Sequence, residues 1–325
     1  MPQRAGLPRG DATVGRVTHV AHFLAEPMTS LPARLPGSFR RTSSVDMHTL
    51  GDGTLELRGI AVDPGGSVDC RALVGKGREL ISLDLRPADR GSVALLGRAV
   101  ARGFRAVVDG LYEPGTLRWI LLSELPVAAL LSGYGSLYTG LFPSPIPDEA
   151  LAGLPVDICA GWAAPASFMV QIRTTREMPT PNGPVSPGDG AGMWHEMPAL
   201  EPGSMRRQRL IQRDGDEVFA MFRDSYARDD GVVTVLHEYS VGATLVPDPD
   251  GRGDLISTCV ATPRVLPWAE CPSAAGSAAR LVGRRVSDLR ALVKNELVGT
   301  STCTHLNDLL ASLSQADHLT ESPVR

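Results

Sequence analysis

Aromatic residues are scarce in this 325-residue chain, at 5%, and no apolar stretch approaches the roughly 18 residues that a membrane-spanning helix needs. Few aromatic side chains leave few platforms on which nucleic-acid bases can stack. The formal net charge of -4 and the pI of about 6.0 indicate no basic stripe for a phosphate backbone. We therefore expect neither a nucleic-acid partner nor a membrane partner.

Cysteine is also sparse, and its spacing excludes two kinds of site. The five cysteines are scattered, odd in number and without a Cys-x-x-Cys pair, so we expect neither a disulfide framework nor a structural zinc site. No charged-then-apolar leader opens the chain, which favours a cytoplasmic protein with reduced thiols. Lysine occurs only at Lys76 and Lys294, and this preference for arginine is typical of a GC-rich bacterial genome.

Several well-known catalytic motifs are absent as well. The chain contains no glycine-rich dinucleotide motif, P-loop, His-Glu-x-x-His or Gly-x-Ser-x-Gly. Their absence excludes the easily recognised dehydrogenases, kinases, zinc proteases and α/β-hydrolases. What remains is an ordinary globular composition, with 43% hydrophobic and 21% charged residues.

Proline, glycine and apolar periodicity predict the organisation of the chain. Residues 1–38 hold several prolines and no sustained apolar period, which predicts a flexible N-terminal arm. The remainder divides into a first half at 39–150, a connecting region at 151–204, a second half at 205–315 and a C-terminal tail at 316–325.

Each half is predicted to contain strands followed by a helix. Alternating apolar and polar residues predict the strands, and apolar residues at three- and four-residue spacing predict the helices. The predicted strands are 42–49, 54–62, 78–86, 206–213, 217–225, 232–246 and 254–263, and the predicted helices are 92–111, 277–297 and 303–314. The connecting region is predicted to hold strands over 156–173 and a long loop over 176–204.

The same order of strands followed by a helix in both halves indicates an internal duplication. Residues 95–100 resemble residues 281–286, and Gly115-Thr116 resembles Gly299-Thr300 at nearly the same offset. The alternative is that amphipathic elements always look somewhat alike. We favour duplication and predict an α+β fold, in which two pseudo-repeated halves, each an antiparallel sheet with a long helix, pack into one body. A glycine inside each predicted helix, Gly97 and Gly283, suggests that backbone and sheet approach closely there.

The densest group of reactive residues lies near the C-terminus. Gly299 ends one predicted helix, and Cys303 and His305 fall in the first turn of the next. The positive end of a helix dipole favours a thiolate and disfavours an imidazolium, so we expect a lowered pKa for Cys303 and a neutral His305. Asp308, three residues further on, can orient the imidazole. The alternative is a helix start with a buried cysteine and a capping histidine.

A second group lies around a predicted hairpin. His237 shares a strand face with Val233 and Val235, where a core histidine is the alternative. Arg223 alternates with Asp224, and we expect an inward Arg223 to anchor a carboxylate and to lower the pKa of Cys303. Asp230 is most simply a turn residue but is also a candidate for substrate binding.

A third candidate for substrate binding is His195, within a proline-rich loop that could cover a pocket. A metal bound by Cys303, His305 and His237 is the remaining alternative. Because Cys-x-His is not an established ligand spacing, we expect no metal and no cofactor.

Three motifs carry a family resemblance. They are Arg41-Thr42-Ser43-Ser44-Val45-Asp46, Ala227-Arg228-Asp229-Asp230-Gly231 and Gly299-Thr300-Ser301-Thr302-Cys303-Thr304-His305-Leu306. With them, residues 39–315 resemble an uncharacterised bacterial family catalogued as domain of unknown function 2889. The motifs Cys159-Ala160-Gly161-Trp162, Trp194-His195-Glu196 and Arg264-Val265-Leu266-Pro267-Trp268 are similar to its actinobacterial branch. The chain departs from the commoner pattern where Val232-Val233 replaces a Leu-Trp pair and where an Asp-x-Lys after His237 is missing. The resemblance supports Cys303, His305 and His237 as candidates and implies no reaction.

Two functions are compatible with these residues. The first is a lyase or hydrolase that acts on a small organic substrate without a redox cofactor. In it His305 or His237 would be the general acid or base and Cys303 a nucleophile or pocket wall. The second is a non-catalytic protein that binds a small molecule or assists another protein. The sequence leaves both functions, and a homodimer, open.

Overall fold

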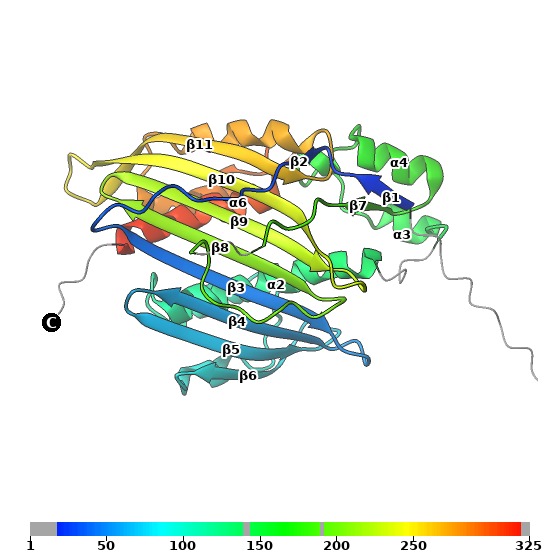
Figure 1. Cartoon of the computed structure of the whole chain (residues 1–325), viewed down its shortest axis with the longest axis horizontal. Coiled ribbons are helices and arrows are strands. Elements are labelled where there is room, and N and C mark those ends of the chain that lie inside the picture. The colour runs from blue at the N-terminus through cyan, green and yellow to red at the C-terminus, as the bar shows by residue number, and fades with distance from the viewer. Residues whose placement is uncertain (1–17, 139–143, 189–191, 320–325) are drawn as a thin grey trace, which may run out of the picture.

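A computed structural model describes residues 18–138, 144–188 and 192–319 (Figure 1). The fold is α+β, and its centre is one nine-stranded antiparallel sheet in the order β2-β11-β10-β9-β8-β3-β4-β5-β6. Its strands are β2 (Leu24–Ala25), β3 (Phe39–Thr49), β4 (Leu55–Asp63), β5 (Gly66–Val74), β6 (Leu80–Arg86), β8 (Met205–Asp214), β9 (Glu217–Ala227), β10 (Val233–Pro247) and β11 (Asp254–Leu266). β1 (Thr18–Ala21) and β7 (Pro179–Asn182) form a separate parallel pair.

Helices cover one face of this sheet, which we call the helix face. The helical elements of the described residues are η1 (Gly91–Leu95), α1 (Phe104–Leu111), α2 (Leu117–Tyr138), α3 (Asp148–Ala152), η2 (Ala160–Trp162), α4 (Ser167–Thr175), η3 (Cys271–Leu281), η4 (Val286–Asp288), α5 (Leu289–Glu296), α6 (Thr304–Ser312) and η5 (Leu313–His318). Of these, α3 and α4 lie beside β1 and β7, beyond one end of the sheet (Figure 1). α2 packs on β3, β4 and β5, while α6 packs on β9 and β10. No helix among residues 18–138, 144–188 and 192–319 is long and apolar enough to cross a membrane.

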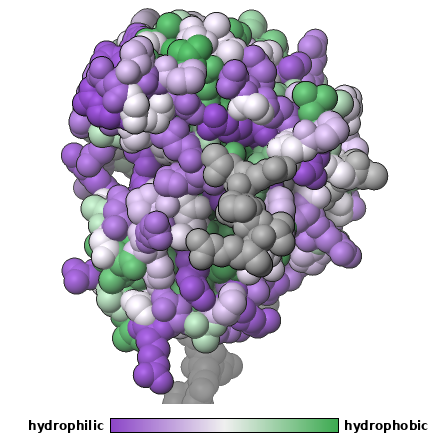
Figure 2. All heavy atoms as spheres, turned by 90° about the vertical axis from the view of Figure 1, so that its left-hand side faces the viewer, coloured by the Kyte–Doolittle hydropathy of each residue, from purple (hydrophilic) through white to green (hydrophobic). Residues whose placement is uncertain are grey.

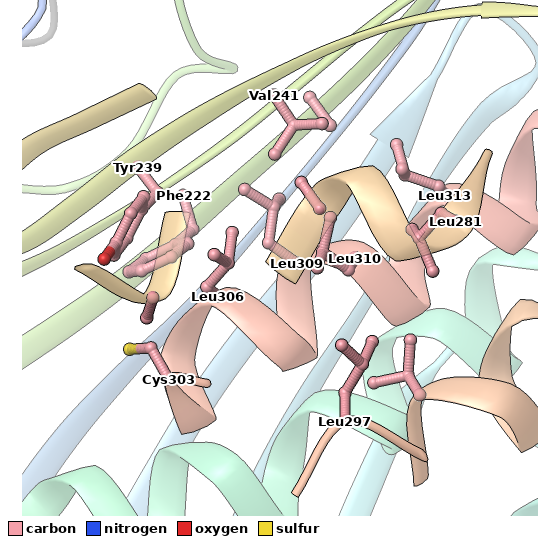
Figure 3. Packing of buried hydrophobic residues seen from close by; sticks show 14 of the residues in the cluster. Phe222, Tyr239, Val241, Leu281, Leu297, Cys303, Leu306, Leu309, Leu310 and Leu313 are labelled. Carbon is pink, nitrogen blue, oxygen red and sulfur yellow. The ribbon is translucent and has the colours of Figure 1, made fainter. Parts of the chain in front are cut away.

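The apolar side chains of the helix face form two cores. One joins α1 and α2 to the strands β3 to β6, and the other joins α4, α5, α6 and η3 to the strands β8 to β11. Figure 3 shows the second core, where Leu306, Leu309 and Leu310 of α6 point toward Phe222 and Val241 of the sheet. Strand alternation places these residues there, because every second side chain of β9 faces the helices.

The opposite face of the sheet, here called the front face, is also covered. Residues 26–38 and the loop before β8 cross it (Figure 1), and Met193, Trp194, Leu210 and Met221 form a small third core there. The Phe23 amide donates to Leu266 O at 3.0 Å. Parts of the segment 22–38 therefore contact the sheet, and the predicted flexibility of the N-terminal arm stays a prediction. Residues 1–17 of that prediction lie outside the described part of the chain.

One end of the molecule carries the β8–β9 and β10–β11 hairpin turns, at the left of Figure 1. Figure 2 faces this end and shows hydrophilic residues over most of it, with hydrophobic residues in small separate groups. The hairpin turns at this end therefore carry the polar residues expected of a surface in contact with water.

Three predicted elements differ from the structure. The expected helix over 92–111 is η1 followed by α1, and the expected helix over 277–297 is η3, η4 and α5. The expected strands over 156–173 are η2 and α4, and the four strands of each half join one sheet rather than two. Within the described part of the chain α2 is the one long helix, and Pro126 lies inside it.

Two glycines explain where the expected long helices break. Gly97 and Gly283 have φ angles of 74° and 78°, which belong to the left-handed region and end a right-handed helix. The amide of Gly97 donates to Leu80 O at 2.8 Å, and the amide of Gly283 donates to Ile256 O at 2.7 Å. Backbone and sheet edge do approach closely at these glycines, but in turns and not within helices.

We expect Gly283→Ala to lower the free energy of unfolding by about 1–2 kcal/mol, because an L-residue is strained at that φ even where its Cβ has space. Gly276→Ala is the matched control, since its Cβ also meets nothing and its φ is not in the left-handed region. Urea denaturation of the three proteins measures both effects. Equal stabilities of the two variants would contradict the strain argument.

Candidate functional site

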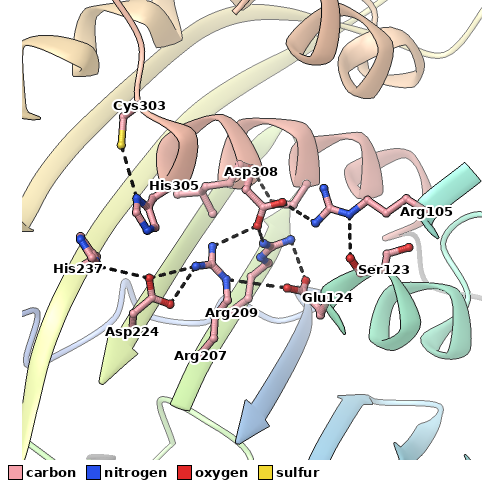
Figure 4. A network of polar contacts seen from close by, with 12 residues as sticks. Arg105, Ser123, Glu124, Arg207, Arg209, Asp224, His237, Cys303, His305 and Asp308 are labelled. Atoms are coloured by element: carbon pink, nitrogen blue, oxygen red, sulfur yellow. Dashed lines mark hydrogen bonds and ion pairs between the residues drawn. The ribbon is translucent and has the colours of Figure 1, made fainter. Parts of the chain in front are cut away.

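A buried network of ionic side chains lies between the two cores (Figure 4). Arg207 and Arg209 point from β8 toward the helices, and Asp308 of α6 accepts from both, at 3.1 Å from Arg207 and at a shorter distance from Arg209. Glu124 of α2 pairs with Arg209 at 2.8 Å, and Arg105 of α1 pairs with Asp308 at 2.7 Å. These contacts connect three helices to the sheet.

Asp224 of β9 extends the network toward the second core. Its two carboxylate oxygens accept from Arg207 Nη1 at 2.9 and 3.0 Å. Burial raises the pKa of Asp224 to about 6, although Arg207 opposes this shift. Burial also acts on Asp308, but there Arg209, Arg105 and Arg207 together hold the pKa well below its usual range. Asp308 is therefore the charge on which the arginines converge.

Beside Asp224 lie two stacked imidazoles. The ring centroids of His237 on β10 and His305 on α6 are 4.1 Å apart and the planes differ by 18°. The ring of Tyr134 on α2 lies edge-on to that of His237, with the two ring centroids 5.2 Å apart. Burial lowers the pKa of His305 to about 3 and that of His237 well below its ordinary value. Both rings are therefore neutral at pH 7, which permits the close stack.

Cys303 is the N-cap residue of α6, and its Sγ lies 4.0 Å from His305 Nδ1. The thiol is buried in the second core near Leu306 and Tyr239 (Figure 3). Burial raises its pKa to about 11, so the predicted lowering is wrong. Removal from water outweighs the helix dipole, which is worth only about 0.3–1 kcal/mol.

A groove with a volume of about 1120 Å³ runs between α1 and α2 on one side and α5 and α6 on the other. Its lining includes five arginine and lysine side chains, from Arg78, Arg102, Arg105, Arg290 and Lys294, and three carboxylates, from Asp109, Asp308 and Asp317. Thr304 and Leu130 also line it, next to His305 along α6 and one turn before Tyr134 along α2. The groove thus reaches the first turn of α6, which also carries His305, but its lining includes neither imidazole of the pair.

The structure brings together Cys303, His305 and His237 of the predicted site and separates the three predicted substrate-binding residues from it. Asp308, which was predicted to orient the His305 imidazole, is one turn further along α6, and its carboxylate instead accepts from the arginines of the network. Arg223 lies on the front face, where it donates to Glu238 at 2.6 Å and to Met28 O at 2.6 Å. It is therefore no anchor near Cys303.

The other two lie elsewhere. Asp230 is an exposed turn residue paired with Arg228 at 2.5 Å. His195 contacts the hydroxyls of Thr42 at 2.9 Å and Ser44 at 3.0 Å on the front face. Neither side chain contacts the imidazole pair. The sheet lies between His195 and the helix face, and Asp230 is in the exposed turn between β9 and β10.

Sequence reasoning missed Asp224, Arg207, Arg209 and Tyr134. Adjacent charges inside a strand, as in Met205–Asp214, are one available signal, since one of two neighbouring charged residues must then face the covered side. Tyr134 offers no comparable signal, because an aromatic residue on a long apolar helix is ordinarily part of a core.

Residues 205–318 match the model of a family described as "Protein of unknown function (DUF2889)". The match extends from β8 through η5 and includes Asp224, His237, Cys303, His305 and Asp308. No curated protein and no solved structure matched the chain. The match confirms the family resemblance over this region, and the resemblance over residues 39–204 stays a prediction.

We expect Asp308→Ala to lower the free energy of unfolding by about 3–5 kcal/mol, because it leaves buried arginines without their shared carboxylate. Asp109→Ala is the control, since Asp109 pairs with Arg290 at a partly exposed site and such pairs are worth about 1 kcal/mol or less. Chemical denaturation measures the free energy of unfolding of both variants and of the wild-type protein. A loss below 1 kcal/mol for Asp308→Ala would contradict the role given to the network.

We expect Cys303 to react with iodoacetamide at pH 7.5 roughly 100-fold or more slowly than an exposed thiol, because a pKa near 11 leaves little thiolate. The other four cysteines are buried with raised pKa values too, so no one of the five should react first. Mass spectrometry of tryptic peptides gives the five rates, and denatured protein supplies the reference rate. Selective labelling of Cys303 would contradict the buried, neutral thiol.

Proposed function

We propose that this protein is an enzyme, a lyase or hydrolase that acts on a small organic anion without a redox cofactor. One observation carries the proposal: two stacked imidazoles, His237 and His305, lie beside the buried carboxylate of Asp224, and Thr304, the chain neighbour of His305, lines a large groove. Burying three such polar groups together costs stability, so their retention favours a chemical role.

The groove supports an anionic substrate. Arg102, Arg290 and Lys294 line it, and the Arg105 guanidinium, whose side chain is 33% exposed, reaches it while paired with Asp308. Guanidinium groups bind carboxylates in paired, planar geometry. A carboxylate held there would direct the rest of a small molecule toward Thr304 in the first turn of α6, and so toward His305.

The second candidate function is non-catalytic binding of a small molecule. One observation favours it: Cys303, which the sequence offered as a nucleophile, is buried with a raised pKa. In that case the groove would hold the ligand, and the imidazole pair would only line its end.

We also propose that the two halves of the chain arose by duplication. Two features support this. The strands β3 to β6 and β8 to β11 are each four-stranded antiparallel meanders followed by helices. The hydrogen bonds that Gly97 and Gly283 make to the fourth-strand residues Leu80 and Ile256 occur at corresponding places.

A cytoplasmic location is part of the same proposal. All five cysteines are free and buried, which is compatible with a reducing compartment.

Metabolite conversion tests the enzyme proposal. A small-molecule extract is incubated with the full-length protein and with His237→Gln/His305→Gln, and mass spectrometry follows the compounds. We expect the wild-type protein to consume at least one organic acid that the double variant leaves unchanged, because the variant lacks both imidazoles but keeps the basic groove.

Equilibrium dialysis of the same extract separates the two candidate functions. A compound that is retained by both proteins and converted by neither would establish the binding function and refute the enzyme. Conversion at equal rates by both proteins would refute the role of the imidazole pair.

A further inference from the structure

Three side chains from three elements converge on one point in the buried layer. Asp224 of β9, His237 of β10 and His305 of α6 each offer a ligand atom, and these atoms lie within 4.8 Å of one another. Asp224 is fully buried, the His237 side chain is 5% exposed and His305 is half-buried. Three nitrogen and oxygen donors in such proximity match the donor set of a catalytic metal centre.

The distance between two of these atoms favours an ion over a direct bond. His237 Nδ1 and Asp224 Oδ2 are 3.8 Å apart, which is too far for a hydrogen bond. Two ligand atoms that each lie about 2.1 Å from one zinc ion at a tetrahedral angle are about 3.4 Å apart. The observed spacing is thus close to that of two ligands around a shared ion.

The hydrogen-bond inventory points to the same place. His237 Nδ1 is buried, and no hydrogen-bond partner is found for it among the described residues. A buried nitrogen without a partner destabilises the folded protein, and a bound cation would supply the missing partner. Neutral imidazole nitrogens are among the commonest metal ligands.

The surroundings also supply the second layer of contacts that metal ligands need. Arg207 donates to both oxygens of Asp224 at 2.9 and 3.0 Å and so fixes the carboxylate. Cys303 Sγ faces His305 Nδ1 at 4.0 Å, which leaves Nε2 as the nitrogen available to an ion. The ring centroids of Phe222 and His305 are 6.2 Å apart, so Phe222 supports one side of the His305 ring. The imidazoles of His237 and His305 are now nearly parallel, and they must turn toward each other for both nitrogens to face one ion.

We propose that Asp224, His237 and His305 bind a divalent first-row transition-metal ion, with zinc as the reference ion. Two imidazoles and one carboxylate favour such an ion over magnesium or calcium, which prefer oxygen ligands. The proposal rests on the same site as the proposed enzyme and gives it a Lewis acid. It replaces the ligand set considered from the sequence, because Asp224 takes the place of Cys303.

The charge balance identifies what occupies the open coordination position. Arg207 already pairs with the only carboxylate in the ligand set, so a divalent ion would leave this point with excess positive charge. Three protein ligands leave at least one position for a further ligand. That ligand is therefore an anion, either hydroxide or an oxygen of an anionic substrate, which agrees with the basic lining of the groove.

Cobalt titration of the full-length protein, stripped with a chelator, tests the site without any substrate. We expect one Co²⁺ per chain with visible absorption bands of a four- or five-coordinate ion. His305→Gln should weaken Co²⁺ binding at least 100-fold, because loss of a ligand exceeds the 10- to 100-fold cost of losing an outer contact. His195→Gln, a histidine of the front face, is the matched control and should bind Co²⁺ like the wild-type protein.

X-ray absorption of the zinc-loaded wild-type protein provides a second test that needs no variant. We expect two imidazoles and oxygen ligands near 2.0–2.1 Å, with no sulfur at 2.3 Å. No stoichiometric Co²⁺ binding by wild type, equal binding by His305→Gln, or a sulfur ligand would each overturn the proposal. Ion binding and metabolite conversion are separate measurements, so either proposal can fail while the other stands.

Discussion

Asp308 is the charge on which the architecture depends. A single carboxylate of α6 accepts from Arg105, Arg207 and Arg209, and these arginines come from both halves of the chain. Without it, the buried ionic network between the two apolar cores, here called the ionic seam, would contain guanidinium groups with too few acceptors. The seam consists of Arg105, Glu124, Arg207, Arg209, Asp224 and Asp308. The cores on either side are ordinary apolar packing, so this ionic seam fixes how the helices of one half lie against the sheet of the other.

The same seam positions the imidazole pair. Arg207 pairs with both Asp308 and Asp224, and Asp224 lies beside His237. Charged side chains in contact therefore connect Asp308, which lines the groove, to the stacked rings. His305 is on the same helix as Asp308, one turn away, and its orientation therefore follows from the contacts that hold α6. Scaffold and site share one set of interactions, and a change in the seam would alter both.

Local patterns in the sequence predicted most of the strands but few of the long-range contacts. Alternation located β9 and β10, and His237 does lie on the face that the C-terminal helices cover. Its predicted place in one row with Val235 was wrong, because a bulge between the two residues puts them on opposite faces. The helices over 92–111 and 277–297 were wrong, because spacing shows an apolar stripe but not the left-handed φ of Gly97 and Gly283. The inward residue of the pair Arg223 and Asp224 could not be chosen either, since each has a buried partner of opposite charge on its own face.

The central pairing of β3 with β8 has a consequence for synthesis of the chain. β3 ends at Thr49, but its partner begins only at Met205, so more than 150 residues must leave the ribosome before the two can join. Until then β3 is an edge strand with unpaired amides and carbonyls, and such edges invite pairing with other chains. The nascent first half is therefore the stage at which β3 is exposed to pairing with other chains, whereas the finished sheet holds β3 between β8 and β4.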